Sequence, residues 1–93
     1  MTLEVVHNEA SQRYELRSDG ELLGLIDYRL EPGAVALVHT EVDPRFEHQG
    51  LGTQLVAGAL ADLRERGLRV IPVCPFVEDY LRRHPEAQIP PGD

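Results

Sequence analysis

The stretch Val42-Asp-Pro-Arg-Phe-Glu-His-Gln-Gly-Leu-Gly-Thr-Gln-Leu-Val56 decides the fold of this chain. Its pattern predicts the end of a strand, a short loop with glycines at 50 and 52, and the start of a helix. The first N–H groups of a helix have no partner within it and lie at the positive end of its dipole. The stretch therefore indicates a site for an anion, above all a phosphate. A tight helix start without a ligand would use the same glycines.

The residues present exclude two common phosphate-binding motifs. The dinucleotide motif G-x-G-x-x-G needs a third glycine where Leu55 stands, and the Walker loop needs a lysine, which this chain lacks. The segment Glu47-His-Gln-Gly50-Leu-Gly52 instead resembles the pyrophosphate loop of the GNAT acetyltransferases, Arg/Gln-x-x-Gly-x-Gly/Ala. Glu47 departs from that pattern, because the family usually has Arg or Gln at the first position.

Motifs on either side of the loop resemble a small single-domain GNAT-like subfamily. Its members carry Thr-Glu-Val before the loop, matched here by residues 40–42. They also carry Cys-Pro-Phe-Val, a tyrosine and His-Pro-Glu, matched by Cys74 to Val77, Tyr80 and His84 to Glu86. The resemblance runs from about Leu22 to Glu86. In that subfamily the first position of the loop motif varies.

Hydrophobic periodicity predicts an α+β fold, a mixed sheet with elements in the order ββββαβα. This order resembles a compact GNAT-like acyl-CoA N-acyltransferase core that lacks the family's N-terminal helices and final hairpin. The chain is expected to form one domain over residues 1–86, followed by a disordered tail, Ala87 to Asp93. A nearly continuous apolar run predicts that the last strand is covered on both faces. The predicted strands are 3–6, 12–17, 21–30, 34–42 and 68–73, and the predicted helices are 50–66 and 75–83.

The resemblance implies that acetyl-CoA binds where the fourth and fifth strands part. In the family, the pantetheine lies between these strands and the pyrophosphate sits on the loop. The residues implied in pyrophosphate binding are His48, Gln49, Gly50, Leu51, Gly52 and Thr53, mainly through backbone N–H groups. The residues implied beside the pantetheine are Val42, Val73 and Cys74. Arg45, Arg82 and Arg83 are further candidates for phosphate contacts.

Three side chains are candidates for catalysis. Glu41 is similar to the family's strand-four base, which would deprotonate the attacking amine, although a solvated strand carboxylate fits equally. Tyr80 resembles the tyrosine that protonates the departing CoA thiolate, although a half-buried tyrosine is the simpler alternative. Cys74 precedes a helix that begins with Pro75. Its thiol would accept the acetyl group, line the channel, or be a buried core residue.

Composition narrows the partners and the location. Sixteen acidic and nine basic residues give a formal charge of −7, which argues against nucleic acid and is compatible with cationic substrates. The single cysteine indicates a reducing compartment, and the chain has no apolar stretch long enough for a bilayer. We therefore expect a cytoplasmic protein without a membrane partner. The four scattered histidines show no metal-ligand spacing, so no metal is expected.

The sequence favours an acetyl-CoA-dependent N-acetyltransferase. The alternative is a non-catalytic module on the same fold that binds CoA or another protein. The acceptor stays open among small amines, polyamines and protein N-termini. A homodimer is also open, because a sheet edge is exposed in so small a domain.

Overall fold

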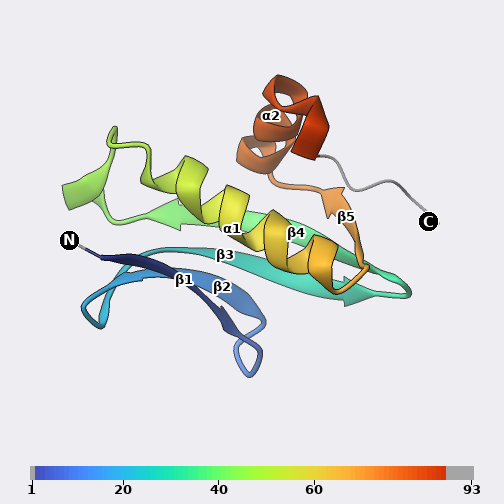
Figure 1. Cartoon of the computed structure of the whole chain (residues 1–93), viewed down its shortest axis with the longest axis horizontal. Helices are drawn as coiled ribbons and strands as arrows, with labels where there is room; N and C mark the ends of the chain where they lie inside the picture. The colour runs from blue at the N-terminus through green and yellow to red at the C-terminus, as the bar shows by residue number, and fades with distance from the viewer. Residues whose placement is uncertain (1, 88–93) are drawn as a thin grey trace.

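A computed structural model describes residues 2–87 of the chain. It contains a five-stranded mixed sheet and two helices in the order ββββαβα, which confirms the predicted fold class (Figure 1). Two short 3₁₀ turns, η1 and η2, were not predicted. The elements are β1 (Leu3–Asn8), β2 (Arg13–Ser18), β3 (Glu21–Glu31), β4 (Ala34–Val42), η1 (Pro44–Phe46), α1 (Leu51–Glu65), β5 (Arg69–Pro72), α2 (Pro75–Arg83) and η2 (Pro85–Ala87).

The first four strands form an antiparallel meander in which each strand pairs with the next. The tightest connection joins β2 to β3 through Asp19 and Gly20, whose φ angles are 50° and 84°. Two successive positive φ angles define the turn whose twist matches that of paired strands. The Asp-Gly pair at this position is among the sequences that such a turn favours.

The fifth strand is parallel to β4 and lies at the edge of the sheet. The prediction that this strand is covered on both faces is wrong. Arg69 is exposed, and the other residues of β5 are only partly buried. The reason is that both helices pack on one face of the sheet, so within residues 2–87 no helix covers the other face of β5, which is also an edge strand paired with β4 alone. Its apolar run supplies Val70 to the core and leaves Val73 with 52% of its surface exposed.

Both helices cover the same face of the sheet. Helix α1 contacts every strand, and α2 contacts α1, β4 and β5 (Figure 1). Val5 of β1 approaches so closely that a Cβ on Gly58 of α1 would lie 2.6 Å from its Cγ2 atom. The buried residues of α1 alternate at helical spacing toward this face: Leu51, Gly52, Leu55, Val56, Ala59, Leu60 and Leu63. This face therefore holds the hydrophobic core.

The opposite face, called the open face here, has no helix over it within residues 2–87. One row of neighbours crosses the sheet there, formed by Val6, Glu15, Leu25 and Glu41. Glu15 is only 2% exposed. Its carboxylate accepts hydrogen bonds from the Arg13 and Arg17 Nε–H groups, at 2.7 and 2.8 Å, and from the Asn8 side chain. These bonds satisfy the buried charge.

The C-terminal end is described as far as Ala87. This residue ends η2, and its side chain packs against the core. The remainder of the predicted disordered tail, residues 88–93, lies outside the described residues. The boundary expected after residue 86 stays a prediction.

Candidate functional site

The sheet parts between β4 and β5. The two strands pair only from Ala34 and Arg69 to Leu37 and Pro72. The N–H groups of Val73 and Cys74 then both bond to the Leu37 carbonyl, at 3.1 and 2.9 Å, and α2 begins. Residues 38–42 of β4 consequently have no strand partner on this side within the described chain. We call these residues the free edge of β4.

The free edge leads directly into the glycine loop. Residues His48 and Gly50 have φ angles of 66° and 76°, so the chain turns twice through the left-handed region before α1. Gly50 is the N-cap of α1 without a side-chain cap, and the first N–H to bond back is that of Gln54, on the Gly50 carbonyl. The N–H groups of the first helical turn are thus available to a ligand.

A cavity of about 340 Å³ lies against this loop. We call it the loop cavity. It contains most of the residues predicted to hold a pyrophosphate, and Val42, but Gln49 is not part of its wall. Its lining residues are Val42, Phe46, Glu47, His48, Gly50, Leu51, Gly52, Thr53 and Phe76.

The two loop glycines have different roles. At Gly50 the positive φ angle itself favours glycine, and a Cβ there would meet nothing within 4 Å. At Gly52 a Cβ would lie 2.8 Å from Cζ of Phe76, so this glycine makes room for an aromatic ring. Phe76 was not among the predicted site residues. Two sequence features could have indicated it: a glycine inside the first turn of α1, at Gly52, and an aromatic residue directly after Cys74-Pro75.

Glu41 lies on the free edge with its side chain on the open face. Its carboxylate is 63% exposed, and its Oε1 atom is 3.4 Å from Nε2 of His39. The two residues alternate on the same face of β4. The arrangement leaves the Glu41 carboxylate accessible to a ligand and gives it a neighbour that can take up or release a proton.

Cys74 is buried on the opposite side of β4. Thr40, a neighbour of Glu41 that points toward the core face, has its Oγ1 atom 3.3 Å from the Cys74 sulfur. Burial by itself raises the pKa of the Cys74 thiol, but the Thr40 hydroxyl and the N–H groups of Val77 and Phe76 favour the thiolate, and the net effect is a lowered pKa. Glu41 and Cys74 therefore flank the free edge from its two faces.

Tyr80 lies on α2. It lies six residues after Cys74, which corresponds to about 9 Å along the helix axis. Its partly buried ring packs against His84, with ring centroids 4.5 Å apart. The structure thus brings Glu41, Cys74 and the loop to one place and leaves Tyr80 beyond them along α2.

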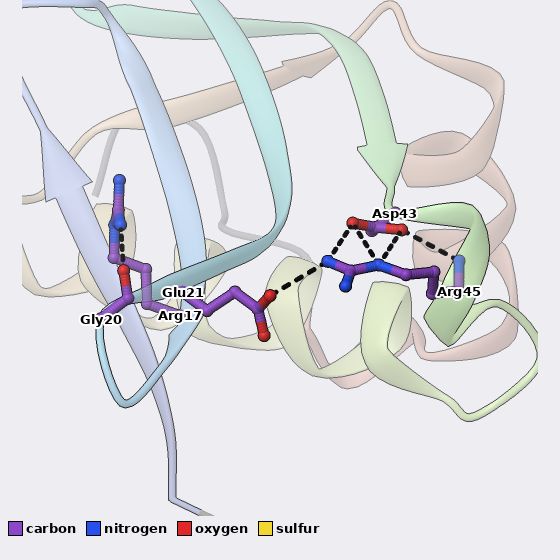
Figure 2. A network of polar contacts seen from close by, with 5 residues as sticks. All are labelled: Arg17, Gly20, Glu21, Asp43 and Arg45. Carbon is purple, nitrogen blue, oxygen red and sulfur yellow. Dashed lines mark hydrogen bonds and ion pairs between the residues drawn. The ribbon is translucent and has the colours of Figure 1, made fainter.

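The arginines suggested for phosphate contacts have carboxylate partners. Arg45 donates hydrogen bonds to Asp43 at 2.9 Å and to Glu21 at 3.0 Å (Figure 2). This network joins the loop to the start of β3, so a phosphate would have to compete with these two ion pairs for Arg45. Arg82 and Arg83 pair with acidic residues one helical turn earlier, at 3.4 and 3.0 Å.

The described residues show neither a metal centre nor a membrane-spanning helix. No cluster of three or more His, Cys, Asp or Glu side chains within residues 2–87 is arranged to hold a metal ion. In the same part of the chain, no helix has both the length and the apolar character needed to span a membrane.

The chain shares its mixed sheet and two helices with a GCN5-like protein of known structure. The chain belongs to the GCN5-related N-acetyltransferase family, because the model of the family described as GCN5-related N-acetyl-transferase matches residues 13–89. This membership classes the chain among the N-acetyltransferases. Among curated proteins, none matches the chain significantly.

Solved structures of similar proteins have the same fold. A GCN5-like protein from Staphylococcus aureus is 25% identical and superposes with a TM-score of 0.70 over 94% of this chain and 85% of its own. The ribosomal-protein-S18-alanine N-acetyltransferase of Escherichia coli is 24% identical, with a TM-score of 0.58 over 62% of this chain. Ard1 of Thermoplasma volcanium is 20% identical, with a TM-score of 0.59 over 84% of this chain. The matched parts are only 38% of the E. coli chain and 58% of Ard1.

Proposed function

We propose that this protein binds acetyl-CoA along the free edge of β4 and transfers the acetyl group to an amine. The observation that carries the proposal is the end of β4–β5 pairing at Leu37, which leaves residues 38–42 without a strand partner up to a loop with free N–H groups. An extended ligand can pair with residues 38–42 as a strand would. A phosphate at its end then reaches the start of α1.

The residues present fit such a ligand. Backbone N–H groups at the start of α1, together with the Thr53 hydroxyl, would hold the pyrophosphate in the loop cavity. Phe76 gives this cavity an apolar wall, and it remains 44% exposed although it is a large aromatic residue. Val42 and Val73 would contact the pantetheine from the two sides of the gap between the strands.

Bound acetyl-CoA supplies an acetyl thioester, and this chain's residues would manage the protons of the transfer. The amine nitrogen forms a bond to the acetyl carbon, the carbon–sulfur bond breaks, and CoA leaves with the bonding electrons. Glu41 would take the proton lost by the amine, with His39 beside it to pass the proton on. Tyr80 would return a proton to the CoA sulfur. N–H groups of the free edge would stabilise charge on the acetyl oxygen.

Cys74 has a different place in this proposal. It approaches the free edge from the core face, whereas Glu41 and an incoming amine use the open face. We therefore assign Cys74 to the channel wall and propose direct attack by the amine. Transfer through an acetylated Cys74 is the competing route, and an added acetyl mass on the protein after incubation with acetyl-CoA would support it.

The alternative function is a module that binds CoA or a protein without transfer. Glu47 favours it, because this residue places a negative charge on the wall of the loop cavity where the family has Arg or Gln. Such a module would bind the ligand without releasing CoA when amines are added. The enzyme would release CoA in proportion to the acetylated amine.

The test is CoA release measured by chromatography over a panel of amines, with and without the Glu41→Gln substitution. We expect Glu41→Gln to lower kcat by about 100-fold or more, the range for loss of a general base, with unchanged affinity for acetyl-CoA. Glu4→Gln is the matched control, because Glu4 is an exposed carboxylate on β1 of the same sheet. Equal loss in both variants, or no release by the wild type with any amine, would contradict the proposal.

We also propose a cellular location and an oligomeric state for the enzyme. The single cysteine and the formal charge of −7 favour work in the cytoplasm on amines rather than on nucleic acid or membranes. β1 is an edge strand along its whole length, so a homodimer through β1 is compatible with the fold. Sedimentation at increasing concentration tests it.

A further inference from the structure

A second cavity, of about 520 Å³, adjoins the free edge. Its walls come from the start of β3 (22–25), the end of β4 (40–42) and the loop residues Asp43, Pro44 and Glu47. We call it the strand-end groove. Glu41 is one of its lining residues, and Glu47 lines both this groove and the loop cavity.

The position of the groove makes it the route for the acceptor amine. From the core face, the free edge is closed by Thr40, Cys74 and α1. In the plane of the sheet, the gap beside β4 is where acetyl-CoA would lie. The open face remains, and no element within residues 2–87 covers it. An amine that reaches Glu41 from this side enters through the strand-end groove.

The charge of the groove is negative. Its lining includes Glu41, Asp43 and Glu47, and none of its lining residues is basic. Asp43 is neutralised by Arg45, and Glu41 has His39 at 3.4 Å. The side chain of Glu47 is exposed, and its carboxylate makes no hydrogen bond or ion pair with other described residues, so its charge is not balanced within the groove. Leu22 and Leu25 give the groove apolar sides.

Glu47 cannot serve the reacting nitrogen. That nitrogen must be a neutral amine when it attacks, and Glu41 is placed to remove its proton. The Glu47 carboxylate would therefore attract a different group, a second and positively charged group on the same acceptor.

We propose that the acceptor is an aliphatic diamine, with one amino group at Glu41 and a second, protonated amino group at Glu47. The apolar carbons between them would lie along Leu22 and Leu25. Only the nitrogen at Glu41 gains an acetyl group, and it loses one proton, while the ammonium at Glu47 keeps its charge. This assignment rests on the proposed function and names the substrate class of its site.

The experiment compares 1,4-diaminobutane with butylamine, which has the same chain and lacks the second nitrogen. CoA release is measured for both, and for diamines with three and five carbons. We expect kcat/KM to be about tenfold or more higher for the best diamine than for its monoamine, as for a charge-assisted hydrogen bond. Glu47→Gln should bring the diamine-to-monoamine ratio close to one. The ratio cancels any effect of this substitution on acetyl-CoA binding.

Glu65→Gln is the matched control, since Glu65 is an exposed carboxylate at the other end of α1. It removes the same charge from the protein and should keep the wild-type ratio. Equal kcat/KM for diamine and monoamine in the wild type would overturn the diamine assignment while acetyl transfer stands. An equal fall of the ratio in both variants would reduce it to a general charge effect and also overturn it. No CoA release with any amine would remove the proposed function and this inference with it.

Discussion

Glu47 is the residue at which this chain departs from its family's loop motif, and the structure places it between two cavities. In the loop cavity its carboxylate would oppose the proposed pyrophosphate. In the strand-end groove the same charge would attract the proposed ammonium group. One substitution therefore has opposite effects on the two ligands, which separates the role of Glu47 from a general loss of structure.

Glu47→Gln is predicted to tighten binding of CoA, because it removes a negative charge from the wall that would face the pyrophosphate. We expect a fall in Kd of about 3- to 10-fold at low ionic strength, and a smaller effect in 0.5 M salt as screening increases. Calorimetric titration at the two salt concentrations checks this. An unchanged Kd at low salt would mean that Glu47 does not face the phosphates.

Cys74→Ala tests which face of β4 carries the chemistry. Since Glu41 and Cys74 flank the free edge from opposite faces, direct attack from the open face does not need the thiol. We predict that the variant keeps kcat within about 3-fold, whereas loss of a covalent nucleophile would remove most of the activity. A kcat as low as that of Glu41→Gln would instead support an acetylated Cys74.

At the scale of elements, the sequence predicted every strand and both helices but not how neighbouring elements meet. The loop motif and the apolar stripe of α1 are local patterns, so they were readable. The opposite placement of Glu41 and Cys74 depends on the β3–β4 register, which shifts between Asp27 and Tyr28. A one-residue shift reverses the face of every later side chain, and no local signal marked this one.

The contact of Gly52 with Phe76 links α1 to α2 beside the loop cavity. Gly52→Ala would place a Cβ 2.8 Å from Cζ of Phe76 and must displace the ring. We predict a loss of about 1–3 kcal/mol in the free energy of unfolding, as for overpacking, together with weaker acetyl-CoA binding. Urea unfolding and titration measure the two effects.

The double variant Gly52→Ala, Phe76→Leu is the control for this contact. The smaller side chain leaves room for the added methyl group, so it should recover part of the stability lost in Gly52→Ala. If the two substitutions were simply additive, the steric explanation would be wrong and glycine would be needed at this position for another reason.

At the scale of the molecule, the open face is stabilised by ion pairs where no helix covers it. Burial by itself raises the pKa of Glu15, but hydrogen bonds from Asn8, Arg17 and Arg13 outweigh it and lower the pKa to about 2. A carboxylate whose pKa is lowered on folding stabilises the fold above its unfolded pKa, and this contribution is lost as the pH falls toward the folded value.

Glu15→Gln is accordingly predicted to lower the free energy of unfolding by about 1–3 kcal/mol at neutral pH. The difference from the wild type should stay constant down to about pH 5 and shrink between about pH 4.5 and 2. Chemical unfolding at a series of pH values checks this. A difference that is the same at pH 2.5 as at pH 7 would show that charge on Glu15 is not what stabilises the open face.

The pattern of apolar residues in the sequence predicted neither the open face of the sheet nor the position of β5 at its edge. An apolar run of residues looks the same in a covered strand and in an edge strand, because the pattern does not report what packs outside it. The site was predictable where it depends on local backbone conformation, as at Gly50, the N-cap of α1. It was not predictable where it depends on contacts between distant segments, as for Phe76 or the strand-end groove.

The free edge of β4 and the loop before α1 are together proposed to hold acetyl-CoA. The most direct test is isothermal titration of the wild-type protein with acetyl-CoA. We predict saturable binding with one site per chain and a micromolar Kd. The absence of any binding heat or saturation at millimolar acetyl-CoA would contradict the account, because no ligand would then occupy the gap between β4 and β5.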